Sequence, residues 1–174
     1  MVNALARRRV TLGFAFGVVA LILATPTRAS LAIGAAVAVA GELLRIWAAG
    51  HLNKSREVTV SGPYRWFAHP LYVGSTVIGI GLAIACASPV VFALIAIYLA
   101  ATLTAAVRSE EAFLRRTFGD RYDQYRRGAL ASGEDGRAFT CAQVRANREY
   151  RAVIGLALTV LLLTLKAALA SHLQ

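Results

Sequence analysis

The sequence is poor in cysteine and in acidic residues, and it lacks the short motifs that mark many soluble enzymes. Two of its 174 residues are Cys, and nine are Asp or Glu against nineteen Lys or Arg. Cys86 and Cys141 fall on opposite sides of the membrane in the topology developed below, so they cannot pair with each other, and neither has the spacing of a metal ligand. There is no GxGxxG, phosphate-loop or HExxH motif and no internal repeat. We therefore predict no disulfide framework and no metal site.

Apolar residues are abundant. They make up 57% of the chain, and the mean hydropathy is +0.58, whereas a soluble domain has about 45–50% apolar residues. The sequence predicts an all-α, polytopic membrane helix bundle with about five transmembrane helices plus a cytoplasmic or interfacial helix over 108–127. The expected apolar segments are residues 10–25, 30–50, 71–87, 89–107 and 151–170.

The net charge of +10 lies mostly on one side of these segments. Most Lys and Arg residues precede the first segment, separate the second from the third, or lie between residues 108 and 151. This positive-inside pattern fits five crossings with the N-terminus in the cytoplasm. The charge would attract anionic headgroups of the bilayer. It does not predict nucleic-acid binding, because the basic residues flank apolar helices and do not line a soluble face.

The first apolar segment has a second interpretation. A basic cluster at Arg7–Arg9, an apolar run and small residues around Pro26 also form the pattern of a cleaved secretion signal. Arg28, just before the candidate cleavage position, and the full length of the second segment favour a retained helix.

The loop Asn53–Pro70 is the most distinctive part of the chain. Gly62-Pro63 predicts a turn, and Pro70 is suited to the first turn of the next helix. Aromatic and imidazole side chains gather just before that helix, at Tyr64, Trp66, Phe67 and His69. Such a cluster can form the wall of a pocket, or it can be an interfacial aromatic belt with a solvated histidine.

Two adjacent carboxylates, Glu110 and Glu111, follow the fourth apolar segment. On a helix, Glu111 can pair with Arg115 at the favourable i, i+4 spacing. Glu110 instead has apolar Phe113 and Leu114 at i+3 and i+4, so we expect its carboxylate to face inward. An inward carboxylate needs a cation or several donors, and a ligand could supply them.

Two further charges, Glu42 and Arg45, lie three residues apart inside the second apolar segment. Charges at that depth are unfavourable unless they are paired or face a wet cavity. They form either an internal ion pair that locks helices together or the lining of a cavity that opens to the cytoplasmic face.

The loop and the carboxylates belong to a longer ordered set of motifs over roughly residues 40–127. These are Gly62-Pro63-Tyr64, His69-Pro70-Leu71-Tyr72-Val73-Gly74, Glu110-Glu111 with Leu114, and Phe118-Gly119-Asp120-Arg121-Tyr122-Asp123-Gln124-Tyr125. The set resembles the isoprenylcysteine carboxyl methyltransferase family and its relatives among phospholipid methyltransferases. The resemblance implies an integral membrane enzyme that transfers a methyl group from S-adenosylmethionine (SAM), bound on the cytoplasmic side, to a lipophilic small molecule or lipidated substrate. The resemblance also implies that SAM is bound without a Rossmann domain.

The resemblance also implies which residues contact the cofactor. In the extended stretch Arg56–Thr59, backbone groups would make the contacts with the cofactor. Glu110 can hold the ammonium or ribose hydroxyls of SAM, His69 its carboxylate or ribose, and Tyr64 or Tyr72 can offer a ring to the adenine or sulfonium. No residue is assigned to the chemical step itself, and His69 and Glu110 would position the cofactor. The implied cofactor-binding residues are Val58, Thr59, Tyr64, His69, Pro70, Leu71, Tyr72 and Glu110.

The acceptor is less well defined, because the chain departs from the family pattern at two positions. Relatives commonly have Arg directly before the His-Pro pair, where this chain has Ala68. Lipid-processing members also have Arg four residues before the first glutamate, taken to meet the acceptor's carboxylate, and here that position is Ala106. Arg108 could substitute from another face of the helix, with Glu42 and Arg45 as further candidates for substrate contact. Otherwise the acceptor is not a carboxylate.

Three alternatives therefore remain open: a phospholipid N-methyltransferase, a relative of the NADPH-dependent membrane reductases, and a non-catalytic membrane scaffold. In each case we expect one integral membrane domain over 1–174. Its expected parts are a helix pair over 1–52, a SAM-binding catalytic region over 53–127, a Gly-, Ala-, Ser- and Asp-rich cytoplasmic link over 128–150, and a final helix over 151–174.

Overall fold

Helices are the regular secondary structure of the residues that the computed structural model describes, which are 16–54, 56–130 and 136–172. No strand occurs within these ranges, so the predicted all-α bundle is confirmed. Residues 16–23 form a short helix. The elements that follow are α2 (Arg28–His51), the 3-10 turn η1 (Gly62–Arg65), α3 (Pro70–Cys86), α4 (Pro89–Phe118), α5 (Asp120–Arg126), α6 (Cys141–Ala146) and α7 (Tyr150–His172).

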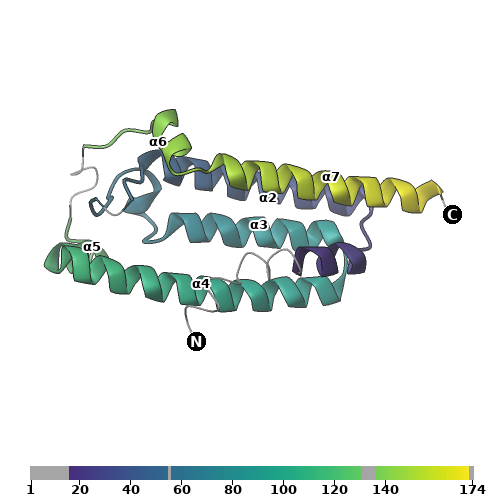
Figure 1. The fold of residues 1–174 in the computed structure, drawn as a ribbon, viewed down its shortest axis with the longest axis horizontal. Helices are drawn as coiled ribbons and strands as arrows, with labels where there is room; N and C mark the ends of the chain where they lie inside the picture. The colour runs from purple at the N-terminus through teal and green to yellow at the C-terminus, as the bar shows by residue number, and fades with distance from the viewer. Residues whose placement is uncertain (1–15, 55, 131–135, 173–174) are drawn as a thin grey trace.

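The long helices run side by side along the longest axis of the molecule. Figure 1 shows α2, α3, α4 and α7 in this arrangement, with α5 and α6 at the end of the bundle where α3 and α7 begin. The loop after α2 lies at the same end, while the short connection from α3 to α4 lies at the opposite end. The polar segments therefore gather at one end, called the polar end below.

Three helices among the described residues are long and apolar enough to cross a membrane: Arg28–His51, Pro89–Phe118 and Tyr150–Ser171. Helix α3 has 17 residues, which gives a length of about 26 Å at 1.5 Å per residue, slightly less than the ~30 Å hydrocarbon core. The first expected segment, 10–25, lies partly outside the described residues. The five-crossing topology with a cytoplasmic N-terminus stays a prediction.

The fourth segment differs from its predicted extent. We expected a span over 89–107 and a separate helix over 108–127, but α4 continues without a break to Phe118. At 30 residues it is about 45 Å long, so its last turns extend beyond the hydrocarbon. Charged side chains do not stop a helix, and the break comes at Gly119, whose φ of +50° favours glycine. Glu110 and Glu111 thus lie on the same helix as the apolar span.

Helices α2 and α3 form the tightest pair because glycines face each other across their contact. A Cβ atom on Gly34 would lie 2.5 Å from the carbonyl oxygen of Gly81, and one on Gly41 would lie 2.8 Å from that of Gly74. Small residues at such contacts let two helix backbones approach closely in a membrane. This pair is the rigid base from which α3 presents His69.

Helix α7 is joined to the bundle near its C-terminal end by Lys166. The Lys166 Nζ donates hydrogen bonds of 2.7 Å to the backbone carbonyls of Leu21 and Ile22, which end the short first helix. At the same end of the bundle, the amide of Thr25 donates to the carbonyl of Cys86 at 2.8 Å. Both cysteines are free thiols, Cys86 buried and Cys141 exposed.

The link expected over 128–150 contains helix α6 and is fixed to the end of α2. The Asn147 side chain donates to the carbonyls of Ala49 and Leu52 at 2.8 and 2.9 Å. The Gln143 side chain donates to the Leu52 carbonyl at 2.8 Å. These bonds cap carbonyls that α2 leaves unpaired at its C-terminus.

Candidate functional site

His69 is held at the entrance of α3 by the proline that follows it. Pro70 occupies the first turn of α3, and His69 is its N-cap residue with a non-helical backbone. A residue before proline is kept out of the α conformation, while proline itself suits the first helical position. The His-Pro pair therefore ends the loop and places the imidazole at the polar end, with 12% of its side chain exposed.

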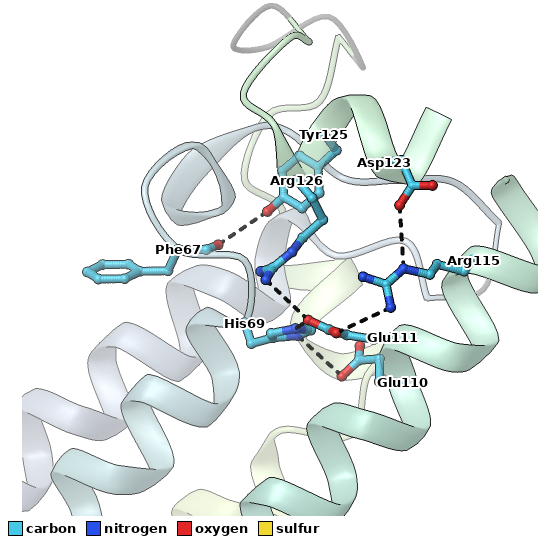
Figure 2. Close-up of polar contacts among 8 residues, drawn as sticks. All are labelled: Phe67, His69, Glu110, Glu111, Arg115, Asp123, Tyr125 and Arg126. Carbon is cyan, nitrogen blue, oxygen red and sulfur yellow. Dashed lines mark hydrogen bonds and ion pairs between the residues drawn. The ribbon is translucent and has the colours of Figure 1, made fainter. Parts of the chain in front are cut away.

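Both ring nitrogens of His69 face carboxylates from α4. Nδ1 lies 3.7 Å from Glu110 Oε2, and Nε2 lies 3.3 Å from Glu111 Oε1. Figure 2 shows both carboxylates extending from α4 toward the imidazole. The structure thus brings His69 and Glu110 together, although 41 positions of chain separate them.

Glu111 has a larger part in this site than its sequence context indicated. Its predicted pair with Arg115 is present at 3.9 Å, but it also lies 3.5 Å from Arg126 Nη2 and contacts His69. Its side chain is 18% exposed, whereas that of Glu110 is 37% exposed. The expectation that Glu110 is the more inward carboxylate is therefore wrong. Helix α5 folds back and brings Arg126 to Glu111, which the local helix pattern could not reveal.

An open hollow of about 590 Å³ lies beside His69, between the first half of α3 and the second half of α4. His69, Tyr72 and Arg108 contribute to its lining, together with the aromatic rings of Trp66 and Phe67. The rings of His69 and Tyr72 are 5.7 Å apart. Five of the residues singled out from the sequence therefore share one surface.

The comparison with known families covers this arrangement except for the contact from Arg126 of α5. Residues 10–121, which include α2, α3, His69 and both carboxylates, match the phospholipid methyltransferase family. The chain belongs to that family. Its membership supports methyltransferase activity in an integral membrane protein. Helices α6 and α7 lie beyond the matched residues.

A curated relative of the chain is named for metal resistance and not for methyl transfer. The chain is 35% identical over 97 residues to the nickel-cobalt-cadmium resistance protein NccN of Alcaligenes xylosoxydans xylosoxydans. The match covers 55% of this chain and 44% of that protein, so the chain spans less than half the length of this relative. No solved structure matches the chain.

The motif after α4 attaches α5 to the His69 loop of this family member. The Tyr125 hydroxyl donates hydrogen bonds to the carbonyls of Tyr64 at 2.8 Å and of Phe67 at 3.3 Å; the second of these is drawn in Figure 2. Burial raises the pKa of Tyr125 to about 12. Burial first, and then the charge of Glu110, raises the pKa of Tyr64. Both phenols stay neutral near pH 7, so Tyr125 keeps its donor proton.

The extended stretch before η1 is buried and holds an unpaired hydroxyl. Val58 and Thr59 are each 4% exposed, and Val58 packs with Tyr122 of α5. Among the described residues, neither Thr59 Oγ1 nor the Tyr122 hydroxyl has a hydrogen-bond partner. Because buried polar atoms are nearly always paired, a bound ligand or ordered water would complete this part of the site.

Glu42 and Arg45 lie apart from the hollow and take part in an ion-pair cluster. Arg45 Nε donates to Glu149 Oε1 at 2.6 Å, while Glu42 lies 3.6 Å from the same nitrogen. Arg45 also donates to the Ser75 hydroxyl and to the carbonyl of Leu71. The internal ion pair is therefore present, but its principal partner is Glu149, at the start of α7.

Glu149 was not found from the sequence. It lies among Arg145, Arg148 and Arg151, where a single acidic residue indicates a solvent-exposed charge. Its position directly before the long apolar run was the one available signal, since a carboxylate is favourable at a helix N-terminus.

Proposed function

We propose that the chain is an integral membrane methyltransferase that uses SAM to methylate a lipophilic acceptor at the polar end of the bundle. The observation that carries this proposal is the convergence of His69 with Glu110 and Glu111 beside the hollow between α3 and α4. A polar cluster next to an apolar hollow suits a reaction between a charged cofactor and a greasy acceptor.

The chemistry of the residues present fits SAM. Glu110 is the more exposed of the two carboxylates and is not paired with an arginine among the described residues, so it is free to accept from an ammonium or from hydroxyls. Thr59 has a buried hydroxyl without a partner in the described part of the chain. We assign cofactor binding to Val58, Thr59, Tyr64, His69, Pro70, Leu71, Tyr72 and Glu110.

When bound, SAM supplies an electrophilic methyl group. The role left to the protein is to hold both reactants in line and to exclude water. A carboxylate acceptor is already ionised near pH 7 and needs no base. On this interpretation His69, fixed between Glu110 and Glu111, positions the cofactor and does not transfer a proton.

A second acceptor class is favoured by the description of the family as phospholipid methyltransferases. An amine acceptor must lose a proton before or during methylation. His69 would then be the candidate base, because its imidazole lines the hollow in which the acceptor would lie.

The metal resistance in the name of the relative does not lead us to propose a metal site. Among the residues that can be placed, there is no group of three or more His, Cys, Asp or Glu side chains arranged to hold a metal ion.

Calorimetry with SAM and the purified protein tests the proposal. We expect His69→Ala and Glu110→Ala to abolish detectable binding while the protein remains monodisperse. Ser109→Ala, an exposed neighbour on the same helix, is the matched control and should bind normally. Undiminished affinity in both site variants would refute the assignment. Binding of NADPH in place of SAM would favour the reductase relatives, and binding of neither would favour a scaffold.

A further inference from the structure

A second hollow lies between α3 and α4, farther from the polar end than His69. It has a volume of about 330 Å³ and shares Thr76, Leu103 and Thr104 with the hollow beside His69. The two hollows therefore form one continuous depression, called the α3–α4 groove below. It extends from Arg108 at its mouth to Phe92 at its far end.

The α3–α4 groove is long enough for a lipid chain. Arg108 and Phe92 are sixteen positions apart on α4, which corresponds to about 24 Å along the helix at 1.5 Å per residue. One leaflet of the hydrocarbon core is about half of 30 Å thick. A chain that fills a leaflet therefore fits along the groove with its head at the mouth.

The walls of the groove are apolar. Away from the mouth they consist mainly of aliphatic and small side chains, such as Ala83, Ala96 and Ala100. The Thr76 hydroxyl donates to the Tyr72 carbonyl within α3 at 3.0 Å, so it is already satisfied. Ile80 and Phe92 are exposed, which opens the groove sideways toward the lipid. An alkyl or isoprenoid chain matches this surface.

The mouth carries a cation that has no partner among the described residues. Arg108 is exposed, and no ion pair or hydrogen bond links its side chain to the part of the chain that is described. By contrast, Arg115 pairs with Glu111 and Asp123, and Arg116 donates to the Ala112 carbonyl. The free guanidinium stands on the same rim as His69. A guanidinium at this position favours an anionic headgroup.

We propose that the α3–α4 groove binds a single-chain anionic amphiphile, a long-chain carboxylate, with its chain between the helices and its head at Arg108. This inference rests on the proposed function, because the bound molecule would be the methyl acceptor. It places the acceptor's carboxylate beside His69, where the proposed cofactor site begins.

Photoaffinity labelling of the purified full chain with hexadecanoic acid, carrying a photoreactive group in mid-chain, tests the occupant. We expect adducts on α3 and α4 that free hexadecanoic acid competes away. Ala100→Trp fills the groove and should reduce labelling about tenfold, as overpacking does. Ala101→Trp adds the same side chain at an exposed position outside the groove lining and should label normally. Ala96→Leu, a smaller obstruction of the same groove, repeats the test if Ala100→Trp does not fold.

The headgroup is tested with Arg108→Gln, which should weaken competition by hexadecanoic acid by up to about fivefold, the upper end of the range for an exposed charge pair. Arg116→Gln, which removes an exposed charge outside the groove, should change nothing. Equal labelling in Ala100→Trp and Ala101→Trp would overturn the groove as the binding site. Stronger competition by hexadecylamine than by the acid would overturn the anionic headgroup and favour a phospholipid amine.

SAM calorimetry on the same samples separates this inference from the proposed function. Groove labelling without SAM binding would leave the ligand assignment standing and overturn the methyltransferase. SAM binding with no labelling of α3 or α4 would overturn the ligand assignment and leave the proposed methyltransferase standing.

Discussion

The ion pair between Arg45 and Glu149 should be the main polar contribution to the stability of the bundle. It joins α2 to the start of α7 across 104 positions of sequence, and the side chains are only 20% and 7% exposed. Glu149→Gln keeps the volume of the side chain and removes its charge. Removing one partner of a buried pair costs about 3–5 kcal/mol.

The loss here should be somewhat smaller, because Arg45 retains other partners. Glu42, the Ser75 hydroxyl and the Leu71 carbonyl all remain in contact with its guanidinium. We therefore expect a loss of about 2–3 kcal/mol. For a chain of 150–250 residues, each kcal/mol shifts the Tm by about 2–4 °C, so the Tm should fall by about 4–12 °C.

The assay is the fraction of detergent-purified protein that stays monodisperse after heating, measured by fluorescence-detected size exclusion. Glu57→Gln is the matched control, because it breaks the more exposed pair with Arg137 and should cost no more than about 1 kcal/mol. The triple variant Glu42→Gln, Arg45→Met and Glu149→Leu should recover most of the loss, since it leaves no charge of the cluster unpaired. A Tm for Glu149→Gln equal to that of Glu57→Gln would refute the reasoning.

Two further predictions concern other parts of the bundle. Lys166→Met removes the two hydrogen bonds to the end of the first helix and should lower the Tm by about 2–8 °C, as the loss of about 1–2 kcal/mol implies; an unchanged Tm in the same assay would contradict it. Burial raises the pKa of Tyr125 from 10.0 to about 12, so its stabilising effect is complete below pH 10 and is lost as the pH rises toward 12. The Tm of the unmodified protein should therefore fall more steeply over that interval than that of Tyr125→Phe, and parallel curves for the two proteins would argue against the assignment.

The helices could be predicted from the sequence because apolar runs act locally. The predicted spans 30–50, 71–87 and 151–170 agree with α2, α3 and α7 to within about two residues at each end. Of the spans that the structure describes in full, the fourth differs from its prediction, because α4 continues to Phe118. There the change from apolar to charged side chains marks where the helix leaves the hydrocarbon, whereas Gly119 marks where the helix itself ends.

The site could be predicted only in part, because some of its contacts join distant segments. The meeting of His69 with Glu110 followed from motifs that resemble a known family. The burial of Glu111 depends on Arg126, which arrives only when α5 folds back. The role of Glu149 depends on a partner more than a hundred positions away, and no local pattern reports such a pairing.

Helix α7 is fastened near both of its tips, by Glu149 to Arg45 and by Lys166 to the carbonyls of Leu21 and Ile22. It therefore connects the two ends of the bundle, although little of its apolar length is buried within the bundle. Exchange of one aliphatic residue for another at the exposed positions in the middle of α7 should have little effect, whereas Leu163 is buried against the bundle. Intolerance to substitution should concentrate at the two fastenings, one at the polar end beside α2 and the other at the opposite end of the bundle.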